Sequence, residues 1–327
     1  MPAESLIPAP GAVRAANPDG TNLAYILAVS YSGSTLLAML LGSQPEGTTV
    51  GEMRVPSLHE PDSYLCSCGE HIKKCGFWNE VSKRMAKKGI SGFDITNAQL
   101  SIHDAQSAYL RRVLDPLPRG SLLEAARKTA LALSPAWPRH LRNVHRRNGA
   151  LVEVLQEITG TKVVIDSSKI ALHLKYLLKS PDLRTKVIHL VRDGRAVTMS
   201  MLGHGFKRSS RQESVAAAAF SWRRNNEAAE RVLDDLPTSQ WRHIAYEELC
   251  RQPEETLRGI CKFLGMDTGR IVLDFRARQQ HILGNDMRLK SGSDIRLDER
   301  WRTALTKEDL AAFEGVAGEM NRKYGYE

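Results

Sequence analysis

An apolar strand near the start of this chain runs directly into a turn of small polar residues and then into a helix. Residues 22–30 form an apolar run of strand length, and residues 36–41 form an apolar helical run. The turn between them is Ser32-Gly33-Ser34-Thr35. Backbone N–H groups at a helix start have no partner within the helix, and the helix dipole adds positive potential there. The junction therefore predicts a cradle for a phosphate or a similar anion, where Gly33 allows close approach.

A second strand, turn and helix start follows much later in the chain. Residues 186–191 form a strand, Asp193-Gly194 forms the turn, and the chain is helical from Arg195. Arg192 stands at the carboxyl end of the strand, and Ser200 lies eight residues later. One guanidinium fork and one hydroxyl can then hold a phosphate group.

With these two segments the sequence resembles the sulfotransferases that use 3′-phosphoadenosine 5′-phosphosulfate (PAPS). The resemblance is closest to the tyrosylprotein sulfotransferases and their bacterial relatives, and it covers most of residues 22–327. It implies a PAPS-dependent enzyme that releases 3′-phosphoadenosine 5′-phosphate (PAP). The implied contacts are Tyr31, Ser32, Gly33, Ser34 and Thr35 for the 5′-phosphosulfate, and Arg192 and Ser200 for the 3′-phosphate.

Further segments match the family pattern. Gly51-Glu52 is similar to the family's Gly-Glu, which implies that Glu52 is the catalytic base. Asp166-Ser167-Ser168-Lys169 closes another predicted strand, residues 161–165, as in bacterial members. Nucleotide contacts are also implied for Tyr246 and, in a C-terminal segment that folds over PAPS, for Asn285, Arg288 and Arg300.

One position departs from the family. Where this chain has Tyr31, the family usually has Arg or Lys, whose charge stabilises the bridging oxygen as the sulfuryl group leaves. Lys169 is the nearest candidate for that charge, because related enzymes carry a catalytic Lys in the loop after the same strand. We therefore predict Glu52 and Lys169 as the catalytic residues.

Predicted strands alternate with predicted helices along the chain. Such alternation favours a parallel sheet with helices on both faces, and ligands then bind at the carboxyl ends of the strands. Together with the resemblance, it predicts an α/β fold of the P-loop NTPase-like type. The predicted strands are residues 22–30, 161–165, 186–191 and 241–245, and the predicted helices begin at Ser34 and Arg195 or span residues 170–179 and 254–264.

We expect a mobile leader at residues 1–20 and a single sulfotransferase domain at residues 21–327. The segment after Glu52 breaks the alternation, and we expect it to form a mainly helical insertion at about residues 54–160 on the acceptor side. Its predicted helices lie near residues 103–114, 122–133 and 139–158.

The net charge of +9 suits an enzyme with an anionic cosubstrate, and it also suits nucleic acid or a membrane surface. Residues 111–149 hold nine basic residues against two acidic ones. A solvated helix face, an acidic acceptor or an anionic lipid surface would each explain this excess. Aromatic residues are only 6% of the chain and no nucleic-acid-binding motif is present, so nucleic acid is not an expected partner. No apolar run approaches the roughly 20 residues that span a bilayer, so we expect a cytoplasmic protein.

Three cysteines lie close together in the sequence. Cys66, Cys68 and Cys75, with His71, offer three thiolates and an imidazole, which are ligands that suit zinc. The spacing differs from that of common zinc fingers, so structural zinc, a disulfide and free thiols are all open. We expect no catalytic metal.

Four other residues have plausible structural roles, and a fifth, His204, has a possible role in the site. We expect Asp193 to pair with a neighbouring arginine or to cap the following helix, and His189 to be a core residue of its strand. Trp222 with Phe220 is expected in the core, and His204 is a candidate to line the nucleotide site.

Two other functions fit the sequence less well than sulfuryl transfer. A P-loop kinase or NTPase needs G-x-x-x-x-G-K-[ST], but the cradle has no Lys and Ala28 replaces the first Gly. A non-catalytic nucleic-acid-binding protein would need a binding motif that is missing. The predicted function is therefore transfer of a sulfuryl group from PAPS to a hydroxyl of a small metabolite, lipid, glycan or peptide.

Overall fold

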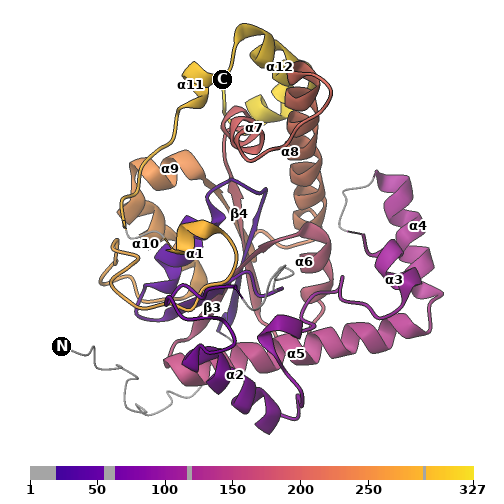
Figure 1. The fold of residues 1–327 in the computed structure, drawn as a ribbon, viewed down its shortest axis with the longest axis vertical. Helices are drawn as coiled ribbons and strands as arrows, with labels where there is room; N and C mark the ends of the chain where they lie inside the picture. The colour runs from indigo at the N-terminus through magenta and orange to yellow at the C-terminus, as the bar shows by residue number, and fades with distance from the viewer. Residues whose placement is uncertain (1–19, 55–62, 116–119, 290–291) are drawn as a thin grey trace.

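The computed structural model describes residues 20–54, 63–115, 120–289 and 292–327, so the leader predicted at residues 1–20 lies outside it except for its last residue. The described residues form a five-stranded parallel sheet of order β2-β3-β1-β4-β5 with helices on both faces (Figure 1). The predicted α/β fold is confirmed. The strands are β1 (Leu23–Ala28), β2 (Gly47–Gly51), β3 (Val163–Lys169), β4 (Thr185–Val191) and β5 (Trp241–Ala245).

Strand β1 lies at the centre of the sheet, between β3 and β4. Its side chains alternate between two cores, with Leu23, Tyr25 and Leu27 on one face and Ala24 and Ile26 on the other. A strand that is covered by helices on both faces of a parallel sheet needs such a continuous apolar run. This is why the first predicted strand became the central one.

Helices form one layer on each face of the sheet. α1 (Ser34–Gly42), α9 (Tyr246–Arg251) and α10 (Pro253–Leu264) pack against the face that carries Ala24 and Ile26. α5 (Ala136–Thr159), α6 (Ala171–Leu177) and α8 (Arg211–Leu233) pack against the opposite face.

The chain between β2 and β3 is mainly helical. Its elements are α2 (Gly76–Lys87), a 3₁₀ turn η1 (Ile95–Asn97), α3 (Ala108–Val113), α4 (Ser121–Ala132) and α5. α5 contributes Leu151 and Leu155 to the core of the sheet, whereas Leu110 and Leu131 pack in a separate cluster. Figure 1 shows α3 and α4 together at one end of α5, away from the strands. Part of α5 thus belongs to the core of the sheet, whereas α3 and α4 project beside it.

The C-terminal part adds a third packed group at the carboxyl side of the sheet. α7 (Gly194–Gly203), α8 and α12 (Lys307–Lys323) enclose Trp222 and Phe313, which confirms the predicted core position of Trp222. Phe220 is 49% exposed, so its predicted core position is wrong. η2 (Asp286–Leu289) and α11 (Trp301–Ala304) lie between α10 and α12. Among the described residues, none of the helices has both the length and the apolar character that crossing a bilayer requires.

Candidate active site

The carboxyl end of each strand carries a residue that the sequence analysis singled out. Glu52 follows β2, Lys169 ends β3, Tyr31 lies in the turn after β1, Arg192 follows β4 and Tyr246 follows β5. The strand order therefore puts the cradle in the centre, the predicted catalytic pair on one side and the predicted nucleotide contacts on the other. Open parallel sheets bind ligands at this edge.

The cradle between β1 and α1 presents polar groups without partners. The Ser32 hydroxyl is buried and has no hydrogen-bond partner. Gly33, with a φ of 85°, is the residue before α1, and no side chain caps the first N–H groups of that helix. The first turn of α1, which holds Ser34 and Thr35, has no acidic side chain to cancel the dipole. These residues fit the predicted anion site.

Tyr246 covers the cradle on the side of β5. A Cβ atom at Gly33 would lie only 2.3 Å from Tyr246 Cδ2, so the ring packs directly on this glycine. The Arg192 guanidinium lies over the same ring, 4.7 Å from its centroid. Burial raises the pKa of Tyr246 above its usual value. Gly33, Tyr246 and Arg192 thus form one packed unit beside the cradle.

Arg192 is buried, and its hydrogen bonds go to backbone oxygens. Nη1 donates to Tyr31 O and Nη2 donates to Asp298 O, both at 3.0 Å, while the Asp298 carboxylate lies 3.5 Å from Nη2. Hydrogen bonds from Arg300 and the charge of Arg192 lower the pKa of Asp298 to about 2. Ser200 is half-buried on α7, and the hydrogen bonds of Arg192 do not go to its hydroxyl. A carboxylate therefore lies beside Arg192, where the 3′-phosphate was predicted.

The structure joins Glu52 and Lys169 directly. Lys169 Nζ donates to Glu52 Oε1 at 2.5 Å and to Ser167 O at 3.1 Å. Arg54 Nη2 donates to Glu52 Oε2 at 3.1 Å. The Glu52 and Lys169 side chains are only 11% and 14% exposed. Sequence reasoning missed Arg54. Its position two residues after Glu52 was the one signal that could have identified it.

Asp166 fixes the backbone beside Glu52. Its Oδ1 accepts the Met53 N–H at 3.0 Å and the Ser168 N–H at 2.9 Å, and it accepts the Ser168 hydroxyl at 2.5 Å. Burial raises the pKa of Asp166 to about 6. Asp166 thus helps to fix the position of Glu52 indirectly, by holding the backbone N–H of Met53, the next residue.

Two non-glycine residues of the site have a left-handed backbone. The φ angle is 69° at Tyr31 and 70° at Lys169. Such angles cost free energy in residues with a Cβ, and they persist where the surrounding structure enforces them. These two residues turn the backbone at the carboxyl ends of β1 and β3, which are neighbouring strands.

Two residues have the structural roles that we predicted, and a third lies beside the cradle. Asp193 accepts the backbone N–H of Arg195 at 2.9 Å and pairs with its guanidinium at 2.8 Å, which confirms both a cap and an ion pair. His189 is buried in β4, and burial lowers its pKa to about 3. The His204 ring lies 4.7 Å from the Tyr31 ring, at the edge of the cradle.

The C-terminal residues predicted to contact PAPS are not gathered at the cradle. Asn285 is exposed, and the Arg300 side chain is 79% exposed and pairs with Asp298. Arg288 is buried and donates to Gly284 O and Leu65 O. Arg288 thus joins the C-terminal segment to the loop that carries the cysteines.

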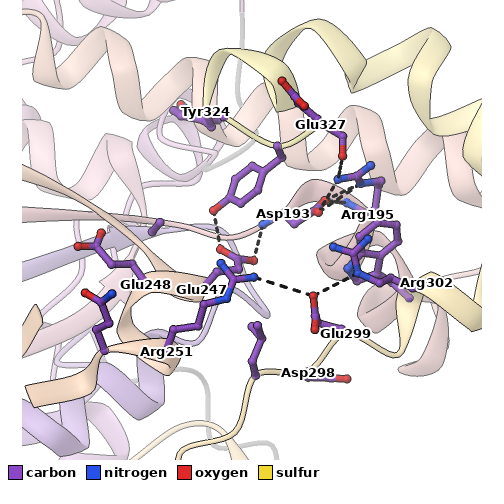
Figure 2. Close-up of a pocket in the computed structure, with 16 residues that line it drawn as sticks. Asp193, Arg195, Glu247, Glu248, Arg251, Asp298, Glu299, Arg302, Tyr324 and Glu327 are labelled. Carbon is purple, nitrogen blue, oxygen red and sulfur yellow. Dashed lines mark hydrogen bonds and ion pairs between the residues drawn. The ribbon is translucent and has the colours of Figure 1, made fainter.

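Asp298 also lines a cavity of about 410 Å³. Figure 2 shows Glu299 between Arg251 and Arg302, and Asp193 paired with Arg195. Six acidic and three basic side chains line this cavity, which does not suit a phosphorylated ligand. It is therefore not the predicted nucleotide site.

A sheet of this topology, with an anion cradle at its central strand and a paired carboxylate and ammonium group beside it, is typical of nucleotide-dependent group-transfer enzymes. The chain belongs to the sulfotransferase family, whose model matches residues 24–269. Family membership confirms the predicted PAPS-dependent sulfotransferase, with PAPS as cosubstrate and PAP as product.

The chain is similar to several solved sulfotransferase structures. The sulfotransferase domain of the Synechococcus PCC 7002 olefin synthase is 19% identical, with a TM-score of 0.52 over 95% of this chain and 97% of that domain. The sulfotransferase domain of the curacin biosynthetic pathway is 17% identical, with a TM-score of 0.48 over 94% and 98% of the two chains. A sulfotransferase from Mycobacterium avium is 14% identical, with a TM-score of 0.47 over 94% and 78%. No curated protein matches the chain.

Proposed function

We propose that this sulfotransferase moves the sulfuryl group of PAPS to a hydroxyl group, with Glu52 as the general base and Lys169 as the cation that stabilises the leaving oxygen. The observation that carries the proposal is the 2.5 Å contact between Lys169 Nζ and Glu52 Oε1. Both groups lie at strand ends on the β3 side of the cradle, where they can reach the sulfuryl group of a cradled phosphosulfate.

The reaction requires the movement of one proton and one negative charge. As the acceptor oxygen bonds to sulfur, its proton passes to Glu52 and the bond from sulfur to the phosphate oxygen breaks. The electron pair of that bond stays on the oxygen, so negative charge grows on the 5′-phosphate of PAP. Lys169 pairs in register with Leu27 of β1, close to the cradle, and its ammonium group can stabilise this charge where Tyr31 cannot. Arg54 keeps its contact with the other oxygen of Glu52.

The other side of the cradle is suited to the nucleotide. We assign the 5′-phosphosulfate to Ser32 and the first turn of α1, and the 3′-phosphate to Arg192 and Ser200. The 3′-phosphate then takes over a contact that the Asp298 carboxylate makes in this structure, so one anion replaces another. Asn285 and Arg300 stay predicted contacts of the nucleotide.

A groove of about 640 Å³ begins beside Lys169 and is our candidate acceptor site. Ile170, the residue after Lys169, lines it together with apolar residues of α6 and α8, including the exposed Phe220. Apolar walls with an excess of basic side chains suit a hydroxylated molecule that has a hydrocarbon part and a negative charge. The charged residues of the lining are Glu124, Arg127, Lys175, Arg208, Arg224 and Arg231.

A cytoplasmic location is part of the same proposal. None of the five cysteines forms a disulfide in the structure, as is usual for proteins of a reducing compartment. The basic residues at 111–149 also make an anionic membrane surface a possible partner, which vesicle binding at varied salt would test.

Calorimetry with PAP and with adenosine 5′-phosphate tests the assignment of the nucleotide. We expect tighter binding of PAP, and Arg192→Ala should cost roughly 2–4 kcal/mol of PAP affinity while hardly changing the affinity for adenosine 5′-phosphate. Arg302→Ala is the matched control, because its side chain is 59% exposed and pairs with Glu299. Equal affinity for the two nucleotides would contradict the assignment.

Transfer from labelled PAPS to long-chain hydroxy acids, to alcohols of the same length and to short hydroxy acids tests the assignment of the acceptor. We expect the highest kcat/KM for the long-chain hydroxy acids. Arg208→Ala should raise KM for these acids and leave PAP affinity unchanged. Equal use of all three acceptors would show that the groove does not select the acceptor.

A further inference from the structure

Three cysteines and a distant histidine form a compact cluster outside the catalytic site. Cys66, Cys68 and Cys75 come from the loop before α2, and His281 comes from the segment after α10. Their sulfur and nitrogen atoms all lie within 4.8 Å of one another. His71, which the sequence suggested as the fourth ligand, is exposed and is not part of the cluster.

The spacing of these atoms matches one metal geometry. With zinc–sulfur bonds of about 2.3 Å and zinc–nitrogen bonds of about 2.0–2.1 Å, a tetrahedron has sulfur–sulfur edges of about 3.8 Å and sulfur–nitrogen edges of about 3.6 Å. The Cys68 and Cys75 sulfurs are 3.7 Å apart. His281 Nδ1 lies 3.6 Å from the Cys66 sulfur and 3.4 Å from the Cys75 sulfur.

We propose that Cys66, Cys68, Cys75 and His281 bind one zinc ion in a closed, structural site. Three thiolates and one imidazole are a ligand set that zinc takes in structural sites, and four protein ligands leave no position for water or substrate. The proposal does not depend on the roles assigned to Glu52 and Lys169.

The chain around the cluster is already arranged for a ligand. Gly69, with a φ of 90°, turns the backbone after Cys68, and its N–H donates to Cys66 O at 2.9 Å. Cys75 immediately precedes α2, whose positive end favours a thiolate. The ring of Phe77 stacks on the ring of His281 at 4.3 Å, which fixes the orientation of the imidazole.

A metal ion at this place would connect the loop before α2 to the chain beside the predicted base. Two residues after His281, the N–H of Leu283 donates to Val50 O at 2.9 Å, next to the end of β2. A Cβ atom at Gly284 would lie 3.3 Å from Glu52 Oε1. The zinc site would thus hold the segment that packs against Glu52.

A disulfide is the main competing arrangement. A disulfide between Cys68 and Cys75 has a bond of about 2.05 Å, so the two sulfurs would have to move closer together. Cys66 and His281 would then have no metal ion to bind. The observed separation of 3.7 Å fits shared ligation better.

Metal analysis of the purified full chain tests the proposal. We expect about one zinc ion per chain, as for a structural site with four protein ligands. Cys75→Ser and His281→Ala should each lower the zinc content by roughly tenfold or more. Cys250→Ser and Cys261→Ser are matched controls, because these thiols lie outside the cluster, and they should keep the metal.

The wild-type protein provides a test that does not depend on whether the variants fold. Cobalt substitution should give the visible bands of a tetrahedral thiolate site, and X-ray absorption of the zinc protein should show three sulfur neighbours and one nitrogen neighbour. Protein that stays metal-free after zinc is supplied, or that contains a Cys68–Cys75 disulfide by mass spectrometry, would overturn the proposal. So would zinc that remains fully bound in both ligand variants.

Discussion

At the residue scale, the position of Glu52 depends on constraints from both of its chain neighbours. Gly51 has a φ of 81°, and a Cβ atom there would lie 2.2 Å from Leu283 O, so no other residue fits. On the other side, the Met53 N–H is held by Asp166. With both of its carboxylate oxygens also bound by cations, Glu52 is held in one orientation before any ligand arrives. A base held in this way is oriented before the acceptor binds.

Glu52→Gln tests the base directly. Glutamine keeps the shape of the side chain and an acceptor oxygen, but it cannot take a proton near neutral pH. We expect PAP affinity to stay almost unchanged while kcat falls by roughly 10²-fold or more. Turnover above about a tenth of wild type at saturating acceptor, a scale set by general-base effects, would exclude Glu52 as the base and make His204 the next residue to test.

Lys169→Ala tests whether Lys169 supplies the positive charge that the family usually has at the position of Tyr31. The charge it stabilises grows only in the transition state, so kcat should fall much more than the KM for PAPS rises. Lys162→Ala is the matched control, because that side chain is 51% exposed and pairs with Glu46. A near-normal kcat in the Lys169 variant would assign the charge to another group, with Arg54 as the first candidate.

The residues of the site were predictable where a motif marked them and not where two distant segments meet. Glu52 and Lys169 each followed from a local motif, but their direct contact depends on β2 and β3 being neighbours. The pair between Arg192 and Asp298 joins residues that are 106 positions apart. His281 had no sequence signal at all, because only the folded chain brings it to the cysteines.

At the element scale, the strand that sequence analysis missed is the one that ends at the predicted base. β2 has the sequence Gly-Thr-Thr-Val-Gly, with a glycine at each end and only five residues, so its local preference for a strand is weak. Pairing with β3 stabilises it, and Thr49 Oγ1 donates to Ile165 O at 2.8 Å. Tertiary contacts thus decide an element that local preference does not.

Two missed helices, in contrast, did carry local signals. Ser210 accepts the backbone N–H of Glu213 at the start of α8, and Thr306 and Asp309 form a capping box at the start of α12. Both patterns are typical of a helix N-terminus and can be recognised from sequence. The strands β1, β4 and β5 were predictable to within two residues; β1 and β4 are buried and end at a turn signal, whereas β5 is followed directly by α9.

Gly33→Ala tests the junction between β1 and α1. The new Cβ would meet the Tyr246 ring at 2.3 Å in a backbone with a φ of 85°, so the cradle must distort. We expect PAP affinity to fall by roughly tenfold or more, as for strain of about 1–3 kcal/mol placed at the binding loop. Gly265→Ala has a similar φ of 76° but no atom within 4 Å of the new Cβ, so it controls for backbone strain alone. Equal PAP binding by both variants would show that Gly33 is not needed for close approach.

At the scale of the whole molecule, one sheet divides the chemistry between its two halves. The predicted nucleotide contacts Arg192 and Tyr246 follow β4 and β5, the predicted catalytic pair comes from β2 and β3, and β1 carries the cradle between them. Since the proposed acceptor groove begins after β3, the acceptor would approach the sulfuryl group from the side opposite to the nucleotide. An in-line displacement requires this arrangement.

The stability of the whole molecule should depend on pH through buried titratable groups. Burial lowers the pKa of His103 to about 4 and the pKa values of His173 and His189 to about 3. The unfolded chain therefore binds more protons below the ordinary histidine pKa of 6.5, so stability is kept above that pH and is lost as the pH falls below it. Asp166 acts in the opposite direction, because its raised pKa favours the folded state as the pH falls below about 6.

Replacing His173 should remove part of this acid sensitivity. At pH 5 each buried histidine costs about 2 kcal/mol and Asp166 returns about 1 kcal/mol, a large net loss against a typical total of about 5–15 kcal/mol. Both ring nitrogens of His173 are buried without partners, so His173→Leu should lose no hydrogen bond and should reduce the loss of stability between pH 7 and pH 5 by about 2 kcal/mol. Urea unfolding at several pH values measures this difference, and His71→Leu, at an exposed position, should leave it unchanged. A wild-type stability that does not fall between pH 7 and pH 5 would mean that these histidines can be protonated in the folded state.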